Sequence, residues 1–473
     1  MSDSPTFQEP PKSVAVSGKG DRLVTSGFVS LLSVSFLEAA NDNLLKQILM
    51  LMVVTGGLWA NQLGDGTQGI ISLVLSVPFI FLSGYAGLIA DKYSKQRVIF
   101  WVKVAEIPIA ICALIGLLLG NFWLSVAALL FLGIHSTFLG PAKYGVIPDL
   151  VDNHRLSQAN GFINALTNVA VILGSLAAGP LADLYYPTVK QAVVATAALE
   201  VADEENATVV AATTTTPQDD YVLVLDPSRQ PQRLPIGITL VLVSVLGLVA
   251  ITAMPKMQPV DPNLTLSFDF LRGHMQTLKD ASRPVMVVLM SWSGFYFIGA
   301  LALLLIPEYR AVLGVSNSSI TSLTGLLAIS IVIGSCAVGL LSGRSIRPYY
   351  ALLGAAGMTV CFTIMGIAPM TYQRLAILMS LVGISAGFYI VPLQSLLQYL
   401  SPPAERGRFF GTANALSFVF IAASGVLFFA LRQAGVPTER MPLVCAVLAL
   451  LGTIVGMLEL KRIMGTNQNG DII

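Results

Sequence analysis

Residues 87–97 have the sequence Gly-Leu-Ile-Ala-Asp-Lys-Tyr-Ser-Lys-Gln-Arg. This short polar stretch joins two long apolar runs, at 68–90 and 97–119. Each run has roughly the 20 residues that an α-helix needs to cross a bilayer. Their continuous hydrophobicity differs from the alternating pattern of about ten residues that marks a strand of a membrane β-barrel. The stretch therefore predicts a tight turn between two membrane-spanning helices.

The composition of the whole chain agrees with this prediction. Of the 473 residues, 55% are apolar and only 11% are charged, and the mean hydropathy is +0.75. Soluble domains are about 45–50% apolar and about 25% charged, so the surface of this chain is expected to face lipid. The net charge of +1 provides no basic surface for nucleic acid. The 4 Cys lie in apolar runs, at spacings that suit packing rather than metal binding, and no cofactor is expected.

Apolar runs of similar length follow one another along the chain, and they number twelve. They lie at roughly 27–56, 68–90, 97–119, 122–147, 161–184, 236–254, 284–306, 319–341, 348–369, 374–397, 411–432 and 441–460. The polar tail before the first run has no cleavage site, so that run is expected to be a retained span rather than a signal peptide. The runs predict an all-α membrane protein with twelve transmembrane helices.

Lys and Arg are distributed unevenly between the connecting segments. With the N-terminus inside the cell, 18 of the 27 fall in inner segments and 7 in outer ones. This bias predicts that both termini are cytoplasmic. The predicted organisation is a tail at 1–24, a six-helix half at 25–254 with an external loop at 186–235, a cytoplasmic linker at 255–283, a six-helix half at 284–462 and a tail at 463–473. Most of the external loop has low complexity, although Tyr221–Leu225 can pair as a short strand.

Landmarks of the first half recur in the second half at nearly one offset. They are Gly87–Lys92 and Gly339–Arg344, 252 positions apart; Pro141 and Pro392, 251 apart; and Asn160 and Asn414, 254 apart. Each pair occupies a similar place in its half. The recurrence predicts two pseudo-symmetric six-helix halves.

The first span carries polar residues that are costly in a membrane. They are Glu38, Asn41, Asp42, Asn43 and Lys46. An ionisable group at the bilayer centre costs about 2.5–3.5 kcal/mol on insertion scales, so each needs a partner or a water-filled path. Glu38, Asp42 and Lys46 are spaced four apart and therefore lie on one face of a helix. We interpret this face as the lining of a substrate cavity; the alternative is a buried ion pair, such as Asp42 with Lys46, that holds helices together.

Two further groups of charged residues carry predictions. Lys103 and Glu106 in the third span are three apart, so they can neutralise each other or complement the first span. His135 in the fourth span is more typical of a packing histidine than of a proton relay. The acid and bases of residues 87–97 can bridge to the other half and hold one state of an alternating-access cycle closed. The residues expected in this conformational gate are Gly87, Asp91, Lys92, Lys95, Arg97, Arg344, Arg406 and Arg408.

The chain resembles the major facilitator superfamily. Residues 87–97 are similar to its signature G-x-x-x-D-[RK]-x-G-[RK]-[RK], with Ser94 where glycine is usual. The chain also resembles the bacterial lysophospholipid transporter family over nearly all of 25–462 except 186–235. The stretches that carry this resemblance are Asn41-Asp-Asn-Leu-Leu-Lys46; Gly140-Pro-Ala-Lys-Tyr-Gly-Val-Ile147 with Ala159-Asn-Gly161; and Val391-Pro-Leu-Gln394 with Gln398 and Arg406-Gly-Arg408.

The family resemblance implies that the protein moves lysophospholipids, such as lysophosphatidylethanolamine, from the outer to the inner leaflet of the bacterial inner membrane. A separate acyltransferase would then restore the second chain, because none of the 3 His begins the H-x-x-x-x-D motif of that enzyme. The protein itself is expected to be a monomer and not an enzyme.

The residues suit such a substrate, which has a charged head and one acyl chain. Glu38 and Asp42 suit an ammonium group, whereas Lys46, Lys103 and Lys143 suit a phosphate. Lys143 can equally extend to the headgroups. The expected substrate pathway comprises Glu38, Asn41, Asp42, Asn43, Lys46, Lys103, Glu106, Lys143, Asn160, Gln394 and Asn414. Asn160 and Asn414 can hydrogen-bond across the pathway or only between helices.

Two other functions compete with lysophospholipid transport. One is a proton-coupled transporter of another solute, with Asp42 or Glu38 as the titrating group. The other is a membrane scaffold that transports nothing. An ATP-driven pump is not expected, because the only Gly-Lys pair, Gly18-Lys19, lacks the remainder of a phosphate-binding motif.

Overall fold

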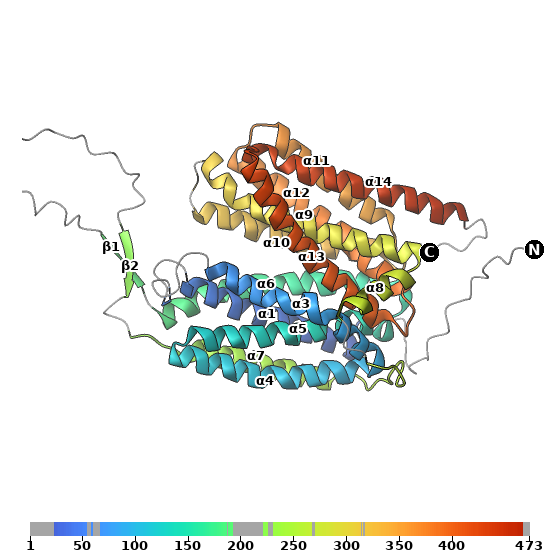
Figure 1. Ribbon diagram of the computed structural model, residues 1–473, viewed down its shortest axis with the longest axis horizontal. Coiled ribbons are helices and arrows are strands. Elements are labelled where there is room, and N and C mark those ends of the chain that lie inside the picture. Colours follow the sequence, from blue (N-terminus) through green and yellow to red (C-terminus); the bar gives the residue numbers. More distant parts are fainter. Residues whose placement is uncertain are drawn as a thin grey trace, which may run out of the picture.

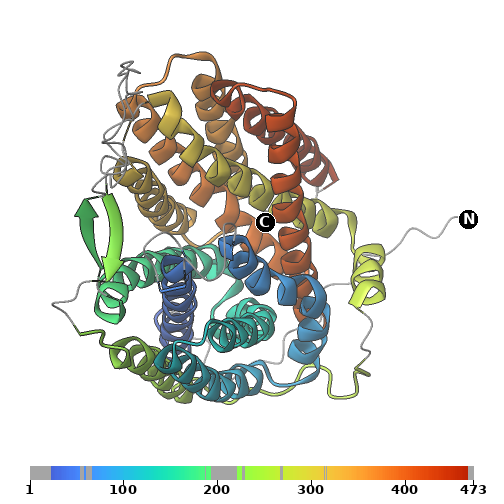
Figure 2. The ribbon, with the colours of Figure 1, turned by 60° about the vertical axis from the view of Figure 1, so that its left-hand side comes forward.

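The computed structural model describes residues 23–53, 58–59, 67–186, 188–192, 221–225, 230–266, 270–313, 315 and 317–466. They form two bundles of helices that lie side by side (Figures 1 and 2). The N-terminal half contains α1 (Ser26–Val53), α3 (Thr67–Lys92), α4 (Lys95–Leu119), α5 (Phe122–Leu150), α6 (Leu156–Tyr185) and α7 (Leu234–Thr252). The C-terminal half contains α9 (Arg283–Leu313), α10 (Asn317–Ser342), α11 (Tyr349–Ile367), α12 (Tyr372–Leu400), α13 (Arg406–Gln433) and α14 (Pro442–Thr466).

Shorter elements mark the two ends of the molecule. The linker helix α8 (Phe270–Asp280) lies at one end, which we call the linker end. The strands β1 (Thr188–Ala192) and β2 (Tyr221–Leu225) lie at the other, the hairpin end, and pair antiparallel with Thr188 opposite Leu225. The strand expected at Tyr221–Leu225 is therefore present. Residues 193–220, the low-complexity core of the predicted loop, lie outside the described residues, as do the tails 1–22 and 467–473. Single turns of 3-10 helix, η1 (Asn153–Arg155) and η3 (Thr438–Arg440), precede α6 and α14.

The long helices correspond one to one with the predicted runs. In the described part of the chain, eleven helices are long and apolar enough to cross a membrane. The remaining long helix is α1, which has 28 residues and carries the polar residues of the first run. The prediction of an all-α, twelve-helix membrane protein is confirmed.

Local sequence sets the sharp turns between neighbouring helices. Gly120 ends α4 in the left-handed conformation at φ +65°, where its N–H returns to carbonyls of the last turn. Asn121 then caps α5 by accepting a hydrogen bond from the Leu124 N–H at 3.0 Å. Gly as a C-terminal cap and Asn as an N-terminal cap satisfy groups that helix ends leave unpaired. The two helices therefore pack antiparallel after a two-residue turn.

The core of the N-terminal half is split into two apolar clusters. One lies toward the hairpin end and contains Leu44 of α1, Ala110 of α4 and Leu132 of α5. The other lies toward the linker end and contains Val34, Ile99 and Leu139 of the same three helices. Between them, each of these helices carries polar residues. This polar layer at mid-bundle positions the candidate site.

Two helix pairs form most of the seam between the halves. In one pair α3 lies beside α13, and in the other α6 lies beside α10. Glycines allow close approach: a Cβ on Gly161 of α6 would lie 2.7 Å from the Ser335 carbonyl oxygen of α10. In the other pair, a Cβ on Gly87 of α3 would clash with the Gly407 carbonyl of α13. The second and fifth helices of one half thus meet the fifth and second of the other, as two pseudo-symmetric halves require.

Candidate substrate pathway and inter-half gate

Glu106 is the centre of the polar layer, and its side chain is only 1% exposed. It accepts hydrogen bonds from Lys103 Nζ at 2.6 Å, Asn41 Nδ2 at 2.8 Å and Ser244 Oγ at 3.3 Å. His135 Nε2 lies 3.4 Å from the same carboxylate. Four helices, α1, α4, α5 and α7, therefore converge on one buried acid. Both expectations for this pair hold, because Lys103 neutralises Glu106 while Asn41 joins it to the first span.

Asp42 lies beside this cluster on α1 and faces α5. Its Oδ2 accepts a hydrogen bond from Ser136 Oγ at 2.6 Å, whereas its Oδ1 is buried without a hydrogen-bond partner. Among the described residues, no ion pair joins Asp42 to Lys46. Asn43 donates to the Ala39 carbonyl of its own helix at 2.8 Å, and no hydrogen bond joins its side chain to another helix in the described part of the chain. Asp42 Oδ1 and the neighbouring Asn41 Oδ1 are therefore the buried acceptor oxygens that this stretch leaves without a partner, and of these two Asp42 alone carries a carboxylate.

Glu38 and Lys143 form the next contact along α1 and α5. Lys143 Nζ lies 3.5 Å from Glu38 Oε2, and Lys143 is only 9% exposed. The ammonium also lies 5.3 Å from the centre of the Tyr144 ring. Lys143 thus points into the bundle instead of extending to the headgroups. Acids on α1 and polar groups on α5 form one row that leads from the polar layer toward the linker end.

Asn160 connects the two halves at the linker end. Its Nδ2 donates to Gln398 Oε1 at 2.6 Å and to Ser395 Oγ at 3.1 Å, both on α12. Gln398 Nε2 returns a bond to Asn160 Oδ1 at 3.1 Å. One turn along, Gln394 Nε2 donates to Asn164 Oδ1 at 3.2 Å. Asn160 therefore bonds across the seam and not only within its half.

Asn414 makes the corresponding approach from the C-terminal half. A Cβ on Gly140 of α5 would lie 2.7 Å from Asn414 Nδ2. Asn160 of α6 thus reaches α12, while Asn414 of α13 reaches α5. The repeated asparagines lie at pseudo-equivalent places on the seam.

Asp91 makes the most buried polar contact of the predicted gate. Its two carboxylate oxygens accept hydrogen bonds from the Gly407 N–H at 2.6 Å and the Arg408 N–H at 2.8 Å. These N–H groups belong to the first turn of α13, where unpaired donors and the helix dipole favour an anion. Gly87 packs against Gly407 one turn earlier on α3. The end of α3 is thereby fixed to the start of α13.

Two bases of the predicted gate pair with a further acid at this end, which sequence reasoning missed. Asp149 at the end of α5 pairs with Lys95 Nζ at 3.2 Å and with Arg406 Nη1 at 3.9 Å. Arg406 also donates from Nε to the Gln398 carbonyl at 3.0 Å. An acid directly after Pro148 at the end of an apolar run was the available signal. Asp149 links the halves because Lys95 and Arg406 come from different ones.

The structure does not bring every predicted gate residue into these contacts. Lys92 Nζ lies 5.9 Å from the centre of the Tyr93 ring. Arg97 is exposed on α4, with no anionic partner in the described part of the chain. Arg344 lies beyond the end of α10, in the turn before α11. A gating role for these three residues stays a prediction.

His274 of α8 also lies at the seam, on a helix that the sequence places only in a linker. Its Nδ1 is 2.9 Å from Thr412 Oγ1 of α13, and a Cβ on Gly84 of α3 would lie 2.9 Å from its ring. The Nε2 is buried without a partner. Burial lowers the pKa of His274 below its usual value. The linker helix thus touches both halves through one imidazole.

The polar groups of the described residues suit binding of a charged organic group. No three His, Cys, Asp or Glu side chains among these residues come together as metal ligands. The polar row offers carboxylates and an ammonium at mid-bundle, and the seam offers contacts that can break and re-form. Such an arrangement can bind a solute between two halves and expose it to one side at a time.

Comparisons with known proteins agree with this geometry. The Major Facilitator Superfamily model matches residues 23–201 and 231–426. Proteins named lysophospholipid transporter LplT, from Yersinia pestis strain Pestoides F and Yersinia pseudotuberculosis serotype O:3, are 26% identical over 420 residues, which is 86% of both chains. Among solved structures, the transporter FucP in the outward conformation has a TM-score of 0.67 at 14% identity, covering 91% of this chain and 98% of its own. The human organic anion transporter MFSD10 has a TM-score of 0.63 at 14% identity, covering 90% and 99%. By its sequence and its fold, the chain belongs to the Major Facilitator Superfamily.

Proposed function

We propose that this protein moves lysophospholipids, such as lysophosphatidylethanolamine, from the outer to the inner leaflet of the bacterial inner membrane by alternating access. The observation that carries the proposal is the row formed by Glu38 and Asp42 of α1 with Ser136 and Lys143 of α5. Relatives named for lysophospholipid transport, at 26% identity, support the choice of substrate.

The chemistry of the row matches a zwitterionic head. Asp42 Oδ1 is a buried acceptor without a donor, and an ammonium group supplies one. Lys143 can exchange its contact with the Glu38 carboxylate for a contact with a phosphate oxygen, because both of these groups are anionic. The pathway thus offers an acceptor to the ammonium group and a cation to the phosphate.

The contacts at the linker end suit one closed state of a cycle. Asp91 with Gly407 and Asn160 with Gln398 join the halves through hydrogen bonds that rigid-body rotation would break together. We propose that this end faces the cytoplasm, with both termini, and that it opens to release the lysophospholipid. A separate acyltransferase would then add the second chain, and a monomer suffices for the cycle.

Proton-coupled transport of another solute is the second candidate. It is favoured by the placement of polar groups between Asp42 and Glu106. Ser136 donates to Asp42 and lies 3.5 Å from Nδ1 of His135, and Nε2 of His135 lies 3.4 Å from Glu106. This chain of polar groups could carry a proton between α1 and α4.

Sealed vesicles with labelled lysophosphatidylethanolamine in one leaflet test both candidates. Faster movement than in protein-free vesicles supports the first, and equal movement rejects it. If movement is seen, abolishing an imposed proton gradient tests whether protons drive it. Absence of transport of any solute by folded protein would favour the scaffold.

A further inference from the structure

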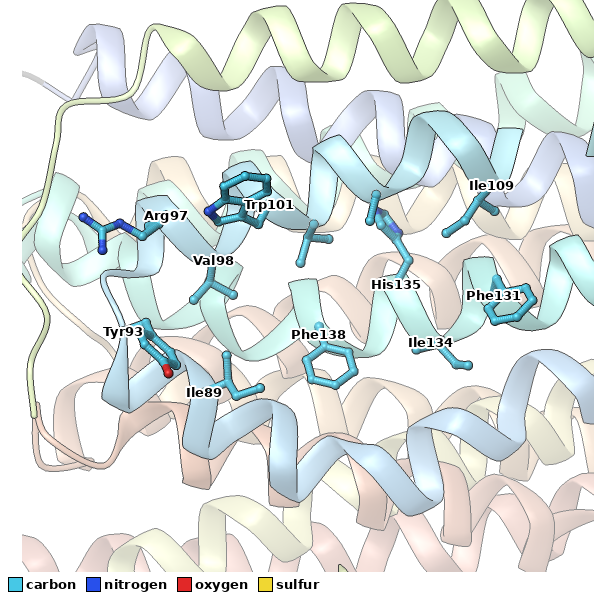
Figure 3. A pocket seen from close by; sticks show the side chains of 12 residues that line it. Ile89, Tyr93, Arg97, Val98, Trp101, Ile109, Phe131, Ile134, His135 and Phe138 are labelled. Carbon is cyan, nitrogen blue, oxygen red and sulfur yellow. The ribbon is translucent and has the colours of Figure 1, made fainter. Parts of the chain in front are cut away.

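A groove with a cavity volume of about 540 Å³ lies on the outer flank of the N-terminal half, between α3, α4 and α5 (Figure 3). This volume is within the range of about 300–1,000 Å³ that small-molecule sites occupy. Trp101 and Phe131 on its walls are 62% and 52% exposed. Exposed aromatic side chains within membrane-spanning helices face lipid tails, so the groove opens sideways into the bilayer. It is separate from the row of Glu38 and Asp42, which lies on α1.

The two ends of the groove differ in chemistry. Figure 3 shows Arg97 and Tyr93 at one end, and Ile109 and Phe131 at the other. Arg97 and Tyr93 flank the α3–α4 turn, so their end is the linker end, where a helix crossing the membrane reaches the headgroups. Arg97 is the only Lys or Arg on the groove walls, and it is exposed. A cation at the interface above an apolar channel matches an amphiphile with a phosphate head and an acyl chain.

The charged residues at the linker end of the groove indicate the net charge of the lipid that binds there. Arg97 makes no ion pair with any anion in the described part of the chain, unlike Lys95 two residues earlier, which pairs with Asp149. Lys92 lies over the Tyr93 ring, so it adds a second positive charge at the same end. Two cations that pair with no anion among the described residues favour a lipid with net negative charge over a zwitterionic one.

The groove also touches the buried charge cluster. His135 lies at its middle, as Figure 3 shows, and its Nε2 is 3.4 Å from Glu106. An acyl chain in the groove would therefore pack against the imidazole that adjoins Glu106 and Lys103.

We propose that this groove is a binding site for an anionic diacyl phospholipid of the leaflet at the linker end. One acyl chain lies along Trp101, Phe138 and His135, and the phosphate contacts Arg97. The site is distinct from the row of Glu38 and Asp42, since none of its walls is formed by α1.

Fluorescence quenching by lipids with brominated chains tests the site in the full-length protein. The chain has 4 Trp, and Trp101 is the one on the groove walls. The part of the quenching that Trp101→Phe removes therefore measures how much brominated lipid lies in the groove. With brominated phosphatidylglycerol titrated into phosphatidylcholine micelles, this part should saturate. Arg97→Gln should raise the lipid fraction needed for half-saturation about tenfold, which corresponds to about 1.4 kcal/mol.

Matched variants make the test specific. Ala105→Phe fills the groove and should abolish the saturable part, whereas Ile115→Phe adds the same ring to the exposed face of α4 beyond the groove and should not. Arg347→Gln removes an exposed charge between α10 and α11 and should leave binding unchanged. Quenching that rises linearly, or that is unchanged in Arg97→Gln and Ala105→Phe, would overturn the proposal. Equal affinity for brominated phosphatidylcholine, or higher affinity for a brominated lysophospholipid, would overturn the assigned occupant.

Discussion

The Asn160 side-chain amide and the Gln398 side-chain amide bond to each other in both directions, at 2.6 and 3.1 Å, across the seam between the two halves. Both side chains are fully buried. A buried amide that loses its partner pays about 1–3 kcal/mol for each unsatisfied group. The pair therefore favours the state in which the linker end is closed, and it would have to find new partners, such as water, when that end opens.

Asp91→Asn should shift the protein toward the state that is open at the linker end. The carboxylate accepts two N–H bonds from α13, and hydrogen bonds to a charged group contribute about 1.5–3 kcal/mol each. Loss of the charge should change the equilibrium at least tenfold. Distances between spin labels at Asp152 and Arg347, which are exposed at this end in different halves, measure the shift. Asp280→Asn is the control, since its 3.5 Å contact with Arg408 is exposed. Identical distance distributions for Asp91→Asn and wild type would contradict the assignment of Asp91 to the gate.

Glu106→Ala should destabilise the N-terminal half by about 3–5 kcal/mol, because it leaves Lys103 charged and unpaired in the interior. Thermal unfolding in detergent measures the loss. The double variant Lys103→Met with Glu106→Leu should recover most of it, since apolar residues of similar volume can replace a buried pair. A loss of stability in the double variant that equals the sum of the losses in the two single variants would show that the two side chains do not act as a pair.

Gly161→Ala should weaken the closure between α6 and α10. Its new Cβ would lie 2.7 Å from the Ser335 carbonyl oxygen, and overpacking of this kind costs about 1–3 kcal/mol. Gly179→Ala on the same helix is the matched control, because nothing lies within 4 Å of the added atom. The control should keep or slightly raise the melting temperature, as Ala does in a helix. A melting temperature that falls equally in both variants would attribute the effect to helix propensity and not to the seam.

Acidification should loosen the linker helix through His274. Burial lowers the pKa of this imidazole in the docked state, so the undocked state binds the proton more tightly. The stability of docking is therefore fully present above the ordinary His value of about 6.5 and falls as the pH drops below it. The protection factors of the α8 amides against hydrogen exchange, measured as a function of pH, report the stability of docking. His274→Asn should remove the dependence, whereas His154→Asn, on the exposed turn before α6, should leave it intact. Protection factors of α8 that do not change with pH in the wild-type protein would contradict the docked arrangement.

Sequence reasoning found the residues whose presence in a membrane is costly. Glu38, Asp42 and Lys103 stand out in apolar runs, and the structure places them in or beside the polar layer. Their partners Ser136 and Ser244 could not be found this way. A small hydroxyl group costs little free energy in a membrane helix, and no regular spacing marks these two serines in the sequence. The contacts between these residues depend on how four helices pack, which spacing along one helix does not determine.

The internal repeat located the seam but not its chemistry. Asn160 and Asn414 were found by their offset, yet the main partner of Asn160 is Gln398, which lies on another helix of the opposite half. His274 lies in a polar linker, so nothing in the sequence around it indicates that α8 docks between α3 and α13. Arg97 belongs to the signature-like turn, but its helix directs it to the outer groove and not to the seam.

Lysophospholipid translocation by Asp42 variants tests the proposed function most directly. In sealed vesicles, wild-type protein should move labelled lysophosphatidylethanolamine between leaflets faster than protein-free vesicles do. Asp42→Asn should reduce this rate at least tenfold while the amount of folded protein stays constant, because it removes the carboxylate that we propose binds the ammonium group. Asp183→Asn, which makes the same change at an exposed carboxylate near the end of α6, should retain it. Equal rates for wild-type protein, Asp42→Asn and protein-free vesicles would contradict the account.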